Sequence, residues 1–322
     1  MKALIRDRYG SPDVLEVRDV PRPVPKEDQV LVRVHATSIN DWDWGLVHGP
    51  TFPIFGTGGR PRVPILGSDV AGRVDEVGSG VQRFKPGDDV FGDLSGVGGW
   101  GGFAEYVCAS ETRLALKPAR MTFEQAAALP QAGQLAVQAI FAAGPLRAGQ
   151  QILINGAGGG VGTIGVQLAK MHDVEVTGVD SAMKHEMMRR IGFDYVIDYA
   201  KEDFTRNGRR YDLIVDTKTT RSAVDYARAV NPGGTYATVG GPSIATLVKI
   251  PLVGLWFRLA ARKTLKLVGL RTNRDLRYLC ERFEAGQLVP VIDGPYSLSE
   301  AREAFRRFGA GRQMGKIVIA ID

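Results

Sequence analysis

A glycine-rich loop carries the strongest chemical signal in the sequence. In ILINGAGGGVGTIGVQLAK (152–170), an apolar strand pattern leads into glycines and then into a helix pattern. Glycines let a backbone turn tightly and approach a pyrophosphate, and a helix start offers N–H groups and a positive dipole end. This order predicts dinucleotide binding rather than a tight structural turn, although Ala157 replaces the first glycine of the strict G-x-G-x-x-G pattern. The loop residues expected at the cofactor are Ala157, Gly159, Gly160, Val161 and Gly162.

A carboxylate ends the next apolar strand pattern, VEVTGVD (174–180). Asp180 can accept hydrogen bonds from the adenosine ribose hydroxyls, which favours NADH and repels the 2′-phosphate of NADPH. Ser181 and Lys184 favour NADPH, because a hydroxyl and an ammonium can hold that phosphate. Asp180 could also be an N-cap of the following helix. The sequence leaves the choice between NADPH and NADH open.

The chain has few residues that could bind a metal ion or form disulfides. Two cysteines, Cys108 and Cys280, form neither a disulfide framework nor, by themselves, a thiolate zinc site. The four histidines show no spacing typical of a ligand set: His35, His48, His172 and His185. We therefore expect no metal.

The elements that must position the loop divide the chain into two domains. Residues 122–270 alternate apolar strands with helices, a pattern that predicts βαβ units and a parallel sheet covered on both faces. Thr122 and Gln125 have the spacing of a capping box at the start of this region. Residues 1–121 have short strand patterns between prolines and glycines, which predict a β-rich, partly closed barrel. We expect 271–322 to complete that first domain, with GKIVIAID as a returning strand.

Composition limits the classes of partner. The formal net charge is +6, but the basic residues are mostly spread out and no basic sheet with interleaved aromatic residues is visible, so nucleic acid is not expected. No run of about 18 apolar residues predicts a membrane span. The N-terminus lacks the apolar stretch of a signal peptide, which makes the cytoplasm the expected compartment.

Residues 245–270 are unusual because apolar residues are crowded around Trp256 and Phe257 beside basic residues. Such a stretch suits a membrane surface. It could also be a lid that supplies an apolar substrate wall. A helix packed in its domain or at a dimer interface is the plainest interpretation.

Seven motifs occur in the order seen in the medium-chain dehydrogenase/reductase superfamily: VLVRVHATSIND, PILGSDVAGRVDEVGSGV, RFKPGDDVFG, GGFAEYV, INGAGGGVG, VIDY and GKIVI. The chain most resembles its zinc-independent quinone oxidoreductase branch, over essentially all 322 residues. The resemblance implies an α/β fold with a GroES-like catalytic domain, a Rossmann cofactor domain and an active site in the cleft between them. It also implies reduction of quinones, enones or related carbonyl compounds by NADPH or NADH, and a homodimer.

The same resemblance shows which metal ligands are missing. Gly67, Ser68 and Asp69 stand where zinc-using members have Gly-His-Glu, and neither ATSINDWDW nor residues 93–106 contain a cysteine. We expect neither the catalytic nor the structural zinc of the superfamily. Without a Lewis acid to polarise an alcohol, reduction of an activated double bond or quinone is favoured. The protein then mainly orients both partners and excludes water.

Three residues are expected in the catalytic site by resemblance: Asn40, Asp43 and Asp69. Asn40 would reach the nicotinamide ribose and Asp43 would shape the cleft, unless both belong to a polar loop that fixes its own backbone. Asp69 would line the cleft or be a buried structural carboxylate.

Four further residues are expected near the cofactor by resemblance. Tyr199 would pack on the adenosine end or be a core tyrosine. Gly240 and Gly241 would let the nicotinamide lie close to the backbone. Lys316 would approach the cofactor or be a surface lysine.

The chain departs from the branch's pattern at three positions: Gly45, Leu135 and Lys218. The branch's proton donor therefore cannot be assigned to a residue of this chain by resemblance. The departures also keep two other functions open, a metal-free NAD(P)-dependent alcohol dehydrogenase and a cofactor-binding regulatory protein with little catalysis.

Overall fold

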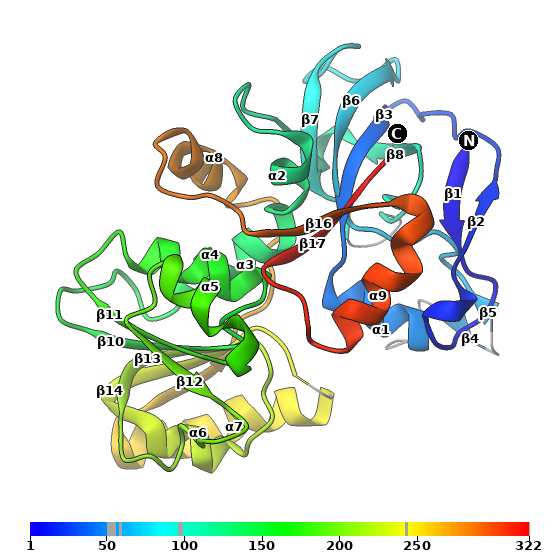
Figure 1. The fold of residues 1–322 in the computed structure, drawn as a ribbon. Coiled ribbons are helices and arrows are strands. Elements are labelled where there is room, and N and C mark those ends of the chain that lie inside the picture. The colour runs from blue at the N-terminus through cyan, green and yellow to red at the C-terminus, as the bar shows by residue number, and fades with distance from the viewer. Residues whose placement is uncertain (50–55, 58–59, 96–98, 242–243, 322) are drawn as a thin grey trace. The chain divides into compact units, whose positions relative to one another are not determined.

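The computed structural model describes residues 1–49, 56–57, 60–95, 99–241 and 244–321. The chain packs into two units (Figure 1). The first comprises Met1–Ala132, Thr272–Glu284 and Pro290–Asp322, and the second comprises Gly133–Arg271 and Ala285–Val289. The division differs from the expected one in three places, the smallest being Arg271, which lies with the second unit. Residues 122–132 lie with the first unit, and 285–289 lie with the second.

The first unit is built on a seven-stranded sheet in the order β16-β17-β3-β6-β7-β9, with β8 also paired to β3. The strands are β3 (Gln29–Ser38), β6 (Asp69–Val77), β7 (Asp89–Asp93), β8 (Tyr106–Ser110), β9 (Ala115–Leu116), β16 (Ile292–Ser297) and β17 (Lys316–Ala320). Two two-stranded sheets accompany it: β1 (Lys2–Ile5) with β2 (Glu16–Asp19), and β4 (Gly56–Thr57) with β5 (Arg60–Pro61). The last strand, β17, runs antiparallel to β3, so the prediction that the C-terminal segment returns to the first sheet is confirmed.

Short helices accompany this sheet in the first unit. They are η1 (Pro12–Val14), α1 (Asp41–His48), η3 (Glu111–Arg113), α2 (Phe123–Ala127), α8 (Leu276–Glu284), η5 (Leu298–Glu300) and α9 (Ala301–Gly309). The predicted capping box is present at α2, where Thr122 accepts from the Gln125 backbone and Gln125 accepts from the Thr122 backbone. Val30, Val32 and Val34 of β3 are buried in the core of the unit, as their alternation predicts.

The second unit has a six-stranded sheet in which all neighbouring strands are parallel. The strands are β10 (Gln151–Asn155), β11 (Glu175–Asp180), β12 (Tyr195–Asp198), β13 (Tyr211–Asp216), β14 (Val230–Thr238) and β15 (Thr264–Leu267). Their spatial order is β12-β11-β10-β13-β14-β15, so the chain order reverses between β10 and β13. Ligands of doubly wound folds bind where this reversal occurs, at the carboxyl ends of the strands. The predicted parallel sheet is confirmed.

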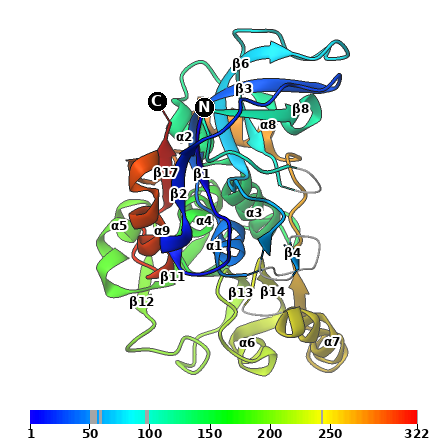
Figure 2. The same ribbon diagram turned by 90° about the vertical axis from the view of Figure 1, so that its right-hand side faces the viewer.

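Helices cover both faces of this sheet (Figures 1 and 2). On one face lie α3 (Pro130–Ile140), α4 (Gly160–Ala169), η4 (Ala182–Lys184) and α5 (His185–Arg190), and on the other lie α6 (Ala223–Ala229) and α7 (Ile244–Ala261). Side chains of one strand therefore enter two cores. Ile152 and Ile154 pack under α4, whereas Leu153 packs under α6. No helix of the described ranges is long and apolar enough to cross a membrane.

Candidate functional site

The glycine turn that follows β10 is shaped for a phosphate group. Gly156 has a φ of 82°, and a Cβ atom at this position would lie 2.0 Å from Thr217 Oγ1. The helix α4 begins at Gly160, and its N-cap, Gly159, has no side chain to accept from the first N–H groups. These groups point to the partly exposed end of the helix, which suits them to an anion such as the pyrophosphate of a dinucleotide.

Ala157 is compatible with this turn because the roles that need a glycine fall on two other residues, Gly156 and Gly162. The sequence interpretation placed the first glycine of the fingerprint at Ala157, but the left-handed turn lies one residue earlier, at Gly156. Gly162 performs the packing role of the last glycine, because a Cβ atom there would lie 2.4 Å from the Ala157 carbonyl oxygen. Gly160 and Val161 lie between Gly159 and Gly162 and begin the first turn of α4.

Asp180, at the carboxyl end of β11, is buried, and both of its carboxylate oxygens have partners. Its Oδ2 accepts from the Gly158 backbone N–H at 2.9 Å, and its Oδ1 accepts from the Ser181 N–H at 2.8 Å. The Lys184 ammonium lies 3.1 Å from Oδ1 and is itself buried. The N-cap of the following η4 is Ser181 rather than Asp180, so the alternative capping role is wrong. Within the described residues, the buried Ser181 Oγ has no hydrogen-bond partner.

The other residues expected around the cofactor have distinct settings in the second unit. Tyr199 is 59% exposed, so the alternative of a core tyrosine is wrong. Gly240 follows the end of β14, and its carbonyl oxygen accepts from the Thr219 and Thr238 hydroxyls. Gly241 is exposed.

One polar centre of the second unit was missed by the sequence analysis. Asp216 ends β13, beside the β10 turn, and is buried. It accepts from Asn155 Nδ2, from Tyr236 Oη and from the Lys218 N–H, each at 2.8 Å, and from the Thr219 N–H at 3.0 Å. This carboxylate fixes the loop after β13 at the point where the strand order reverses. The available signal was the recurrence of polar residues at the ends of successive apolar strands.

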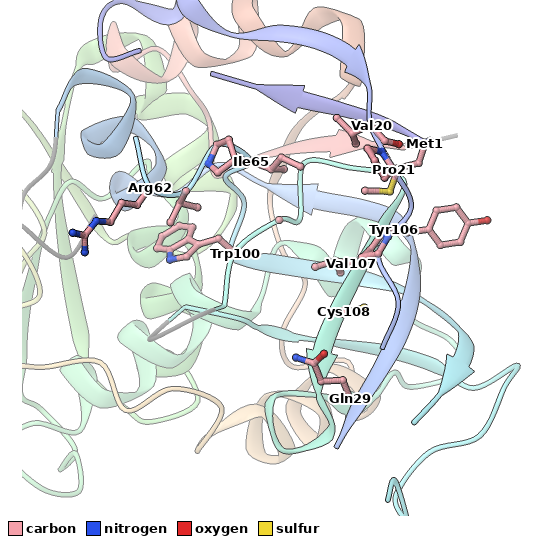
Figure 3. Close-up of a pocket in the computed structure, with 14 residues that line it drawn as sticks. Met1, Val20, Pro21, Gln29, Arg62, Ile65, Trp100, Tyr106, Val107 and Cys108 are labelled. Atoms are coloured by element: carbon pink, nitrogen blue, oxygen red, sulfur yellow. Dashed lines mark hydrogen bonds between the residues drawn. The ribbon is translucent and has the colours of Figure 1, made fainter. Parts of the chain in front are cut away.

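A surface pocket of about 470 Å³ lies in the first unit (Figure 3). It is lined by Met1, by Val20 and Pro21 after β2, by Trp100 and by Tyr106, Val107 and Cys108 of β8, among others. None of the residues expected in the catalytic or cofactor site lines this pocket.

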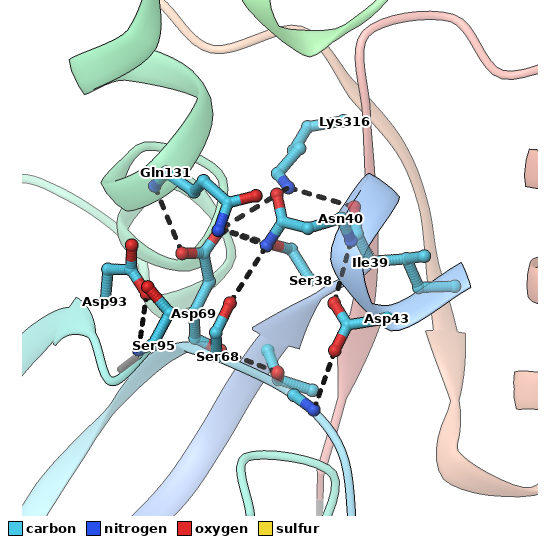
Figure 4. Close-up of polar contacts among 12 residues, drawn as sticks. Ser38, Ile39, Asn40, Asp43, Ser68, Asp69, Asp93, Ser95, Gln131 and Lys316 are labelled. Carbon is cyan, nitrogen blue, oxygen red and sulfur yellow. Dashed lines mark hydrogen bonds and ion pairs between the residues drawn. The ribbon is translucent and has the colours of Figure 1, made fainter. Parts of the chain in front are cut away.

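A buried polar cluster of the first unit joins Asn40, Asp69 and Lys316 (Figure 4). Lys316 Nζ donates to the Ile39 carbonyl at 2.9 Å and to Asn40 Oδ1, and lies 3.3 Å from Asp69 Oδ2. Asn40 Nδ2 donates to the same Asp69 oxygen at 2.9 Å. Lys316 is buried, so the alternative of a surface lysine is wrong.

The carboxylate of Asp69 contacts several residues of this cluster. Besides the contacts with Asn40 and Lys316, its Oδ2 accepts from Ser38 Oγ at 2.9 Å and its Oδ1 accepts from the Gln131 N–H at 3.1 Å. A buried charge requires a counter-charge and hydrogen bonds, and Asp69 has both. These contacts hold Asn40 and Lys316 beside Asp69, as expected of a buried structural carboxylate.

The carboxyl group of Asp43 accepts hydrogen bonds from backbone N–H groups. It is buried in the first turn of α1, where Oδ2 accepts from the Asn40 N–H and Oδ1 from the Gly67 N–H, both at 2.9 Å. Burial raises the pKa of Asp43 to about 7. The carboxyl group ties the end of β3 to the turn that precedes β6, which agrees with a loop that fixes its own backbone.

A second buried carboxyl group faces Asp69 and was also missed. Asp93 lies opposite Asp69 in the β6–β7 register. Its Oδ1 accepts from the Ser95 N–H at 2.7 Å, whereas its buried Oδ2 has no hydrogen-bond partner in the described part of the chain. Burial, reinforced by the charge of Asp69, raises the pKa of Asp93 to about 6. Like charges directly opposite one another in a sheet are unfavourable, so the pair is best accommodated with one proton.

We expect Asp93→Asn to remove a pH-dependent loss of stability. The folded protein holds the Asp93 proton between pH 3.8 and about 6, where the unfolded chain has lost it, so raising the pH through this window destabilises the fold. At about 1.4 kcal/mol per pKa unit, the variant should gain about 3 kcal/mol relative to the unaltered protein at pH 7. Urea unfolding at pH 4 and pH 7 measures this difference. The exposed Asp75→Asn serves as control, and parallel pH profiles for all three proteins would refute the assignment.

The chain is similar to known proteins over its whole length. Two family models match it, one for an alcohol dehydrogenase GroES-like domain at residues 26–119 and one for a zinc-binding dehydrogenase at residues 191–319. The chain is 34% identical to the 2-methylene-furan-3-one reductase of Solanum lycopersicum, over 99% of this chain and 79% of that protein. It is 33% identical to the chloroplastic NADPH-dependent alkenal/one oxidoreductase of Arabidopsis thaliana, with the same two coverages.

A solved structure matches over the whole chain. The quinone oxidoreductase from Coxiella burnetii has a TM-score of 0.86 and 30% sequence identity, covering 100% of this chain and 99% of that one. This chain belongs to the quinone oxidoreductase branch of the medium-chain dehydrogenase/reductase superfamily. It is an oxidoreductase that uses a nicotinamide cofactor. The predicted class, a GroES-like domain with a Rossmann domain, is confirmed.

One of the two matching family models is described as zinc-binding, which makes the positions of the expected zinc ligands relevant. Ser68 stands at the histidine position, and its hydroxyl lies 3.3 Å from the donating Asn40 Nδ2. Across the described ranges, no three His, Cys, Asp or Glu side chains gather closely enough to hold a metal ion.

Proposed function

We propose that this oxidoreductase reduces quinones, enones or related carbonyl compounds with NADPH and without zinc. The observation that carries the proposal is the turn at Gly156 together with the uncapped start of α4. We call this turn and helix start the phosphate cradle; it lies where the strand order of the sheet reverses. The substrate class is supported by the relatives, whose names specify a furanone reductase, an alkenal/one oxidoreductase and a quinone oxidoreductase.

The bound cofactor supplies a hydride, and the protein's residues position the partners. We propose that Asn40 contacts the nicotinamide ribose region and that Asp69 and Lys316 are positioning residues, because they hold both ends of its amide. Asp43 positions the same segment through the Asn40 backbone. Such fixed polar groups cost no reorganisation when charge develops on the substrate.

The second unit supplies the proposed cofactor contacts. Ala157, Gly159, Gly160, Val161 and Gly162 form the phosphate turn and the first turn of α4. The exposed ring of Tyr199 is available to the adenosine end, and Gly240 and Gly241 offer backbone without side chains to the nicotinamide. These assignments complete the cofactor site that we propose.

The geometry around Asp180 favours NADPH over NADH. A free carboxylate would repel a 2′-phosphate, but Asp180 is engaged by two backbone N–H groups and by the Lys184 ammonium. The unsatisfied Ser181 hydroxyl is available as a donor to the phosphate, and a buried group without a partner is unusual in a finished site. Lys184 and Ser181 therefore support NADPH, while Asp180 organises them.

We further propose a homodimer in the cytoplasm. The outer edge of β15 pairs with no other strand of the described chain, and such an edge offers backbone hydrogen bonds to a second copy.

Steady-state turnover tests the proposed function. The purified protein is mixed with NADPH or NADH and a panel of soluble quinones, enones and aldehydes, and loss of reduced nicotinamide is followed by absorbance. We expect turnover of quinones or enones, faster with NADPH than with NADH. No binding of either cofactor by fluorescence titration would overturn the proposal.

A further inference from the structure

The outer face of α7 carries a continuous apolar stripe. Leu252, Leu255, Trp256 and Leu259 are 67%, 61%, 63% and 80% exposed. Their spacing of three, four and seven residues from the first places them on one face of the helix. Surface helices of globular proteins normally turn polar residues to this side.

The opposite face of α7 is already packed on its own sheet. Ile250 is buried in the core with Leu265 of β15, and Phe257 packs against the same cluster. A Cβ atom at Gly254 would lie 2.7 Å from the Leu265 carbonyl oxygen, so the helix approaches the strand closely. The stripe therefore points away from the sheet to which α7 is anchored. A helix that is apolar on all sides is normally covered on all sides.

The sequence segment that contains the stripe carries charge of one sign. From Tyr226 to Arg274 the sequence contains no aspartate or glutamate and eight basic residues: Arg228, Lys249, Arg258, Arg262, Lys263, Lys266, Arg271 and Arg274. Lys249 and Arg258 are exposed on α7, and Arg262 is exposed directly after its end. Lys263 and Lys266 instead donate to carbonyl oxygens.

We propose that this face of α7 docks on the surface of an anionic lipid bilayer. The four stripe residues would enter the boundary between headgroups and acyl chains, where tryptophan is favoured. Lys249, Arg258 and Arg262 would lie at the level of the lipid phosphates, which attract basic residues next to an apolar face.

The charges favour a lipid surface over a second copy of the chain as the occupant. A two-fold contact through this face would bring the exposed basic residues of both copies together, and residues 226–274 contain no acidic side chain to pair with them. An anionic bilayer satisfies the apolar stripe and the basic flanks together. The inference does not depend on the substrate or on turnover.

Vesicle co-sedimentation of the full chain tests the proposal. We expect binding to phosphatidylcholine vesicles that contain phosphatidylserine, much weaker binding to phosphatidylcholine alone, and loss of binding at high salt. Leu255→Gln should weaken binding about ten-fold by removing a buried side chain from the bilayer boundary. Arg258→Gln should weaken it about five-fold at low salt.

Two matched variants serve as controls. Leu116→Gln changes a leucine of β9 that is as exposed as Leu255, and Arg277→Gln changes an exposed arginine of α8. Both should bind vesicles like the unaltered protein. Absence of binding to the mixed vesicles, or equal binding by Leu255→Gln, would overturn the proposal. Concentration-dependent dimerisation that Leu255→Gln abolishes, without vesicle binding, would assign the face to a second copy instead.

Discussion

Lys316→Met is expected to lower the free energy of unfolding by about 3–5 kcal/mol. The methionine keeps the apolar stem but removes the ammonium that faces Asp69 at 3.3 Å. The buried Asp69 carboxylate would lose its counter-charge, and the Ile39 carbonyl would lose a donor. An uncompensated buried charge is among the most destabilising changes a single substitution makes. Urea unfolding at pH 7 measures the effect.

Two further variants show whether the pair itself is responsible. Lys85→Met changes an exposed lysine of the same unit and should alter stability by less than about 0.5 kcal/mol. Adding Asp69→Asn to Lys316→Met removes the unpaired charge, so the double variant should be more stable than Lys316→Met alone. A Lys316→Met protein as stable as the Lys85→Met control would contradict the buried ion pair.

Gly162→Ala is expected to raise the dissociation constant for NADPH about 100-fold, because one or two charge-assisted hydrogen bonds to the phosphates are lost. The new Cβ atom would lie 2.4 Å from the Ala157 carbonyl oxygen and 2.6 Å from its Cα. These are backbone atoms, so the loop and the start of α4 must separate. The N–H groups of the phosphate cradle then move out of position. Fluorescence titration with NADPH measures the change.

Gly165→Ala is the matched control for this prediction. It lies in the same helix, but its Cβ atom would meet the terminal carbon of the Ile154 side chain at 3.3 Å, which can adjust. We expect it to bind NADPH like the unaltered protein. Equal dissociation constants for Gly162→Ala and Gly165→Ala would place the pyrophosphate elsewhere.

Local patterns were sufficient to predict several strands of the second unit and the glycine loop between β10 and α4. The apolar runs before Asn155, Asp180 and Asp216 are strands, and the glycine loop leads from β10 into α4. Periodicity and turn chemistry act within a few residues, so the sequence displays them directly. The position of the turn was less accessible, because Gly156 and Ala157 share it and only the backbone angle distinguishes their roles.

The polar cluster of the first unit depends on contacts that no local pattern contains. Lys316 reaches Asn40 and Asp69 only because β17 pairs with β3, and Asp93 faces Asp69 only in the observed β6–β7 register. Register is set by the packing of the whole sheet, so the burial of these charges could not be deduced from composition or spacing.

Asp180 and Lys184 show a different limit of sequence reasoning. Each was interpreted as favouring one cofactor, the carboxylate NADH and the ammonium NADPH. The structure pairs them at 3.1 Å, four residues apart. The spacing was itself a signal, since side chains at i and i+4 lie side by side where the chain is helical. Similarly, α7 is apolar all round, and periodicity alone does not separate a buried face from an exposed one.

The most direct test of the account is hydride transfer from NADPH to a soluble quinone or enone, measured on metal-free protein beside the Gly162→Ala variant. The account predicts consumption of NADPH that is faster than that of NADH, persists after chelation, and falls sharply in the variant at low cofactor concentration. Cofactor binding without turnover of any quinone, enone or aldehyde would contradict it and favour a regulatory protein. Activity restored only by added zinc would contradict it equally.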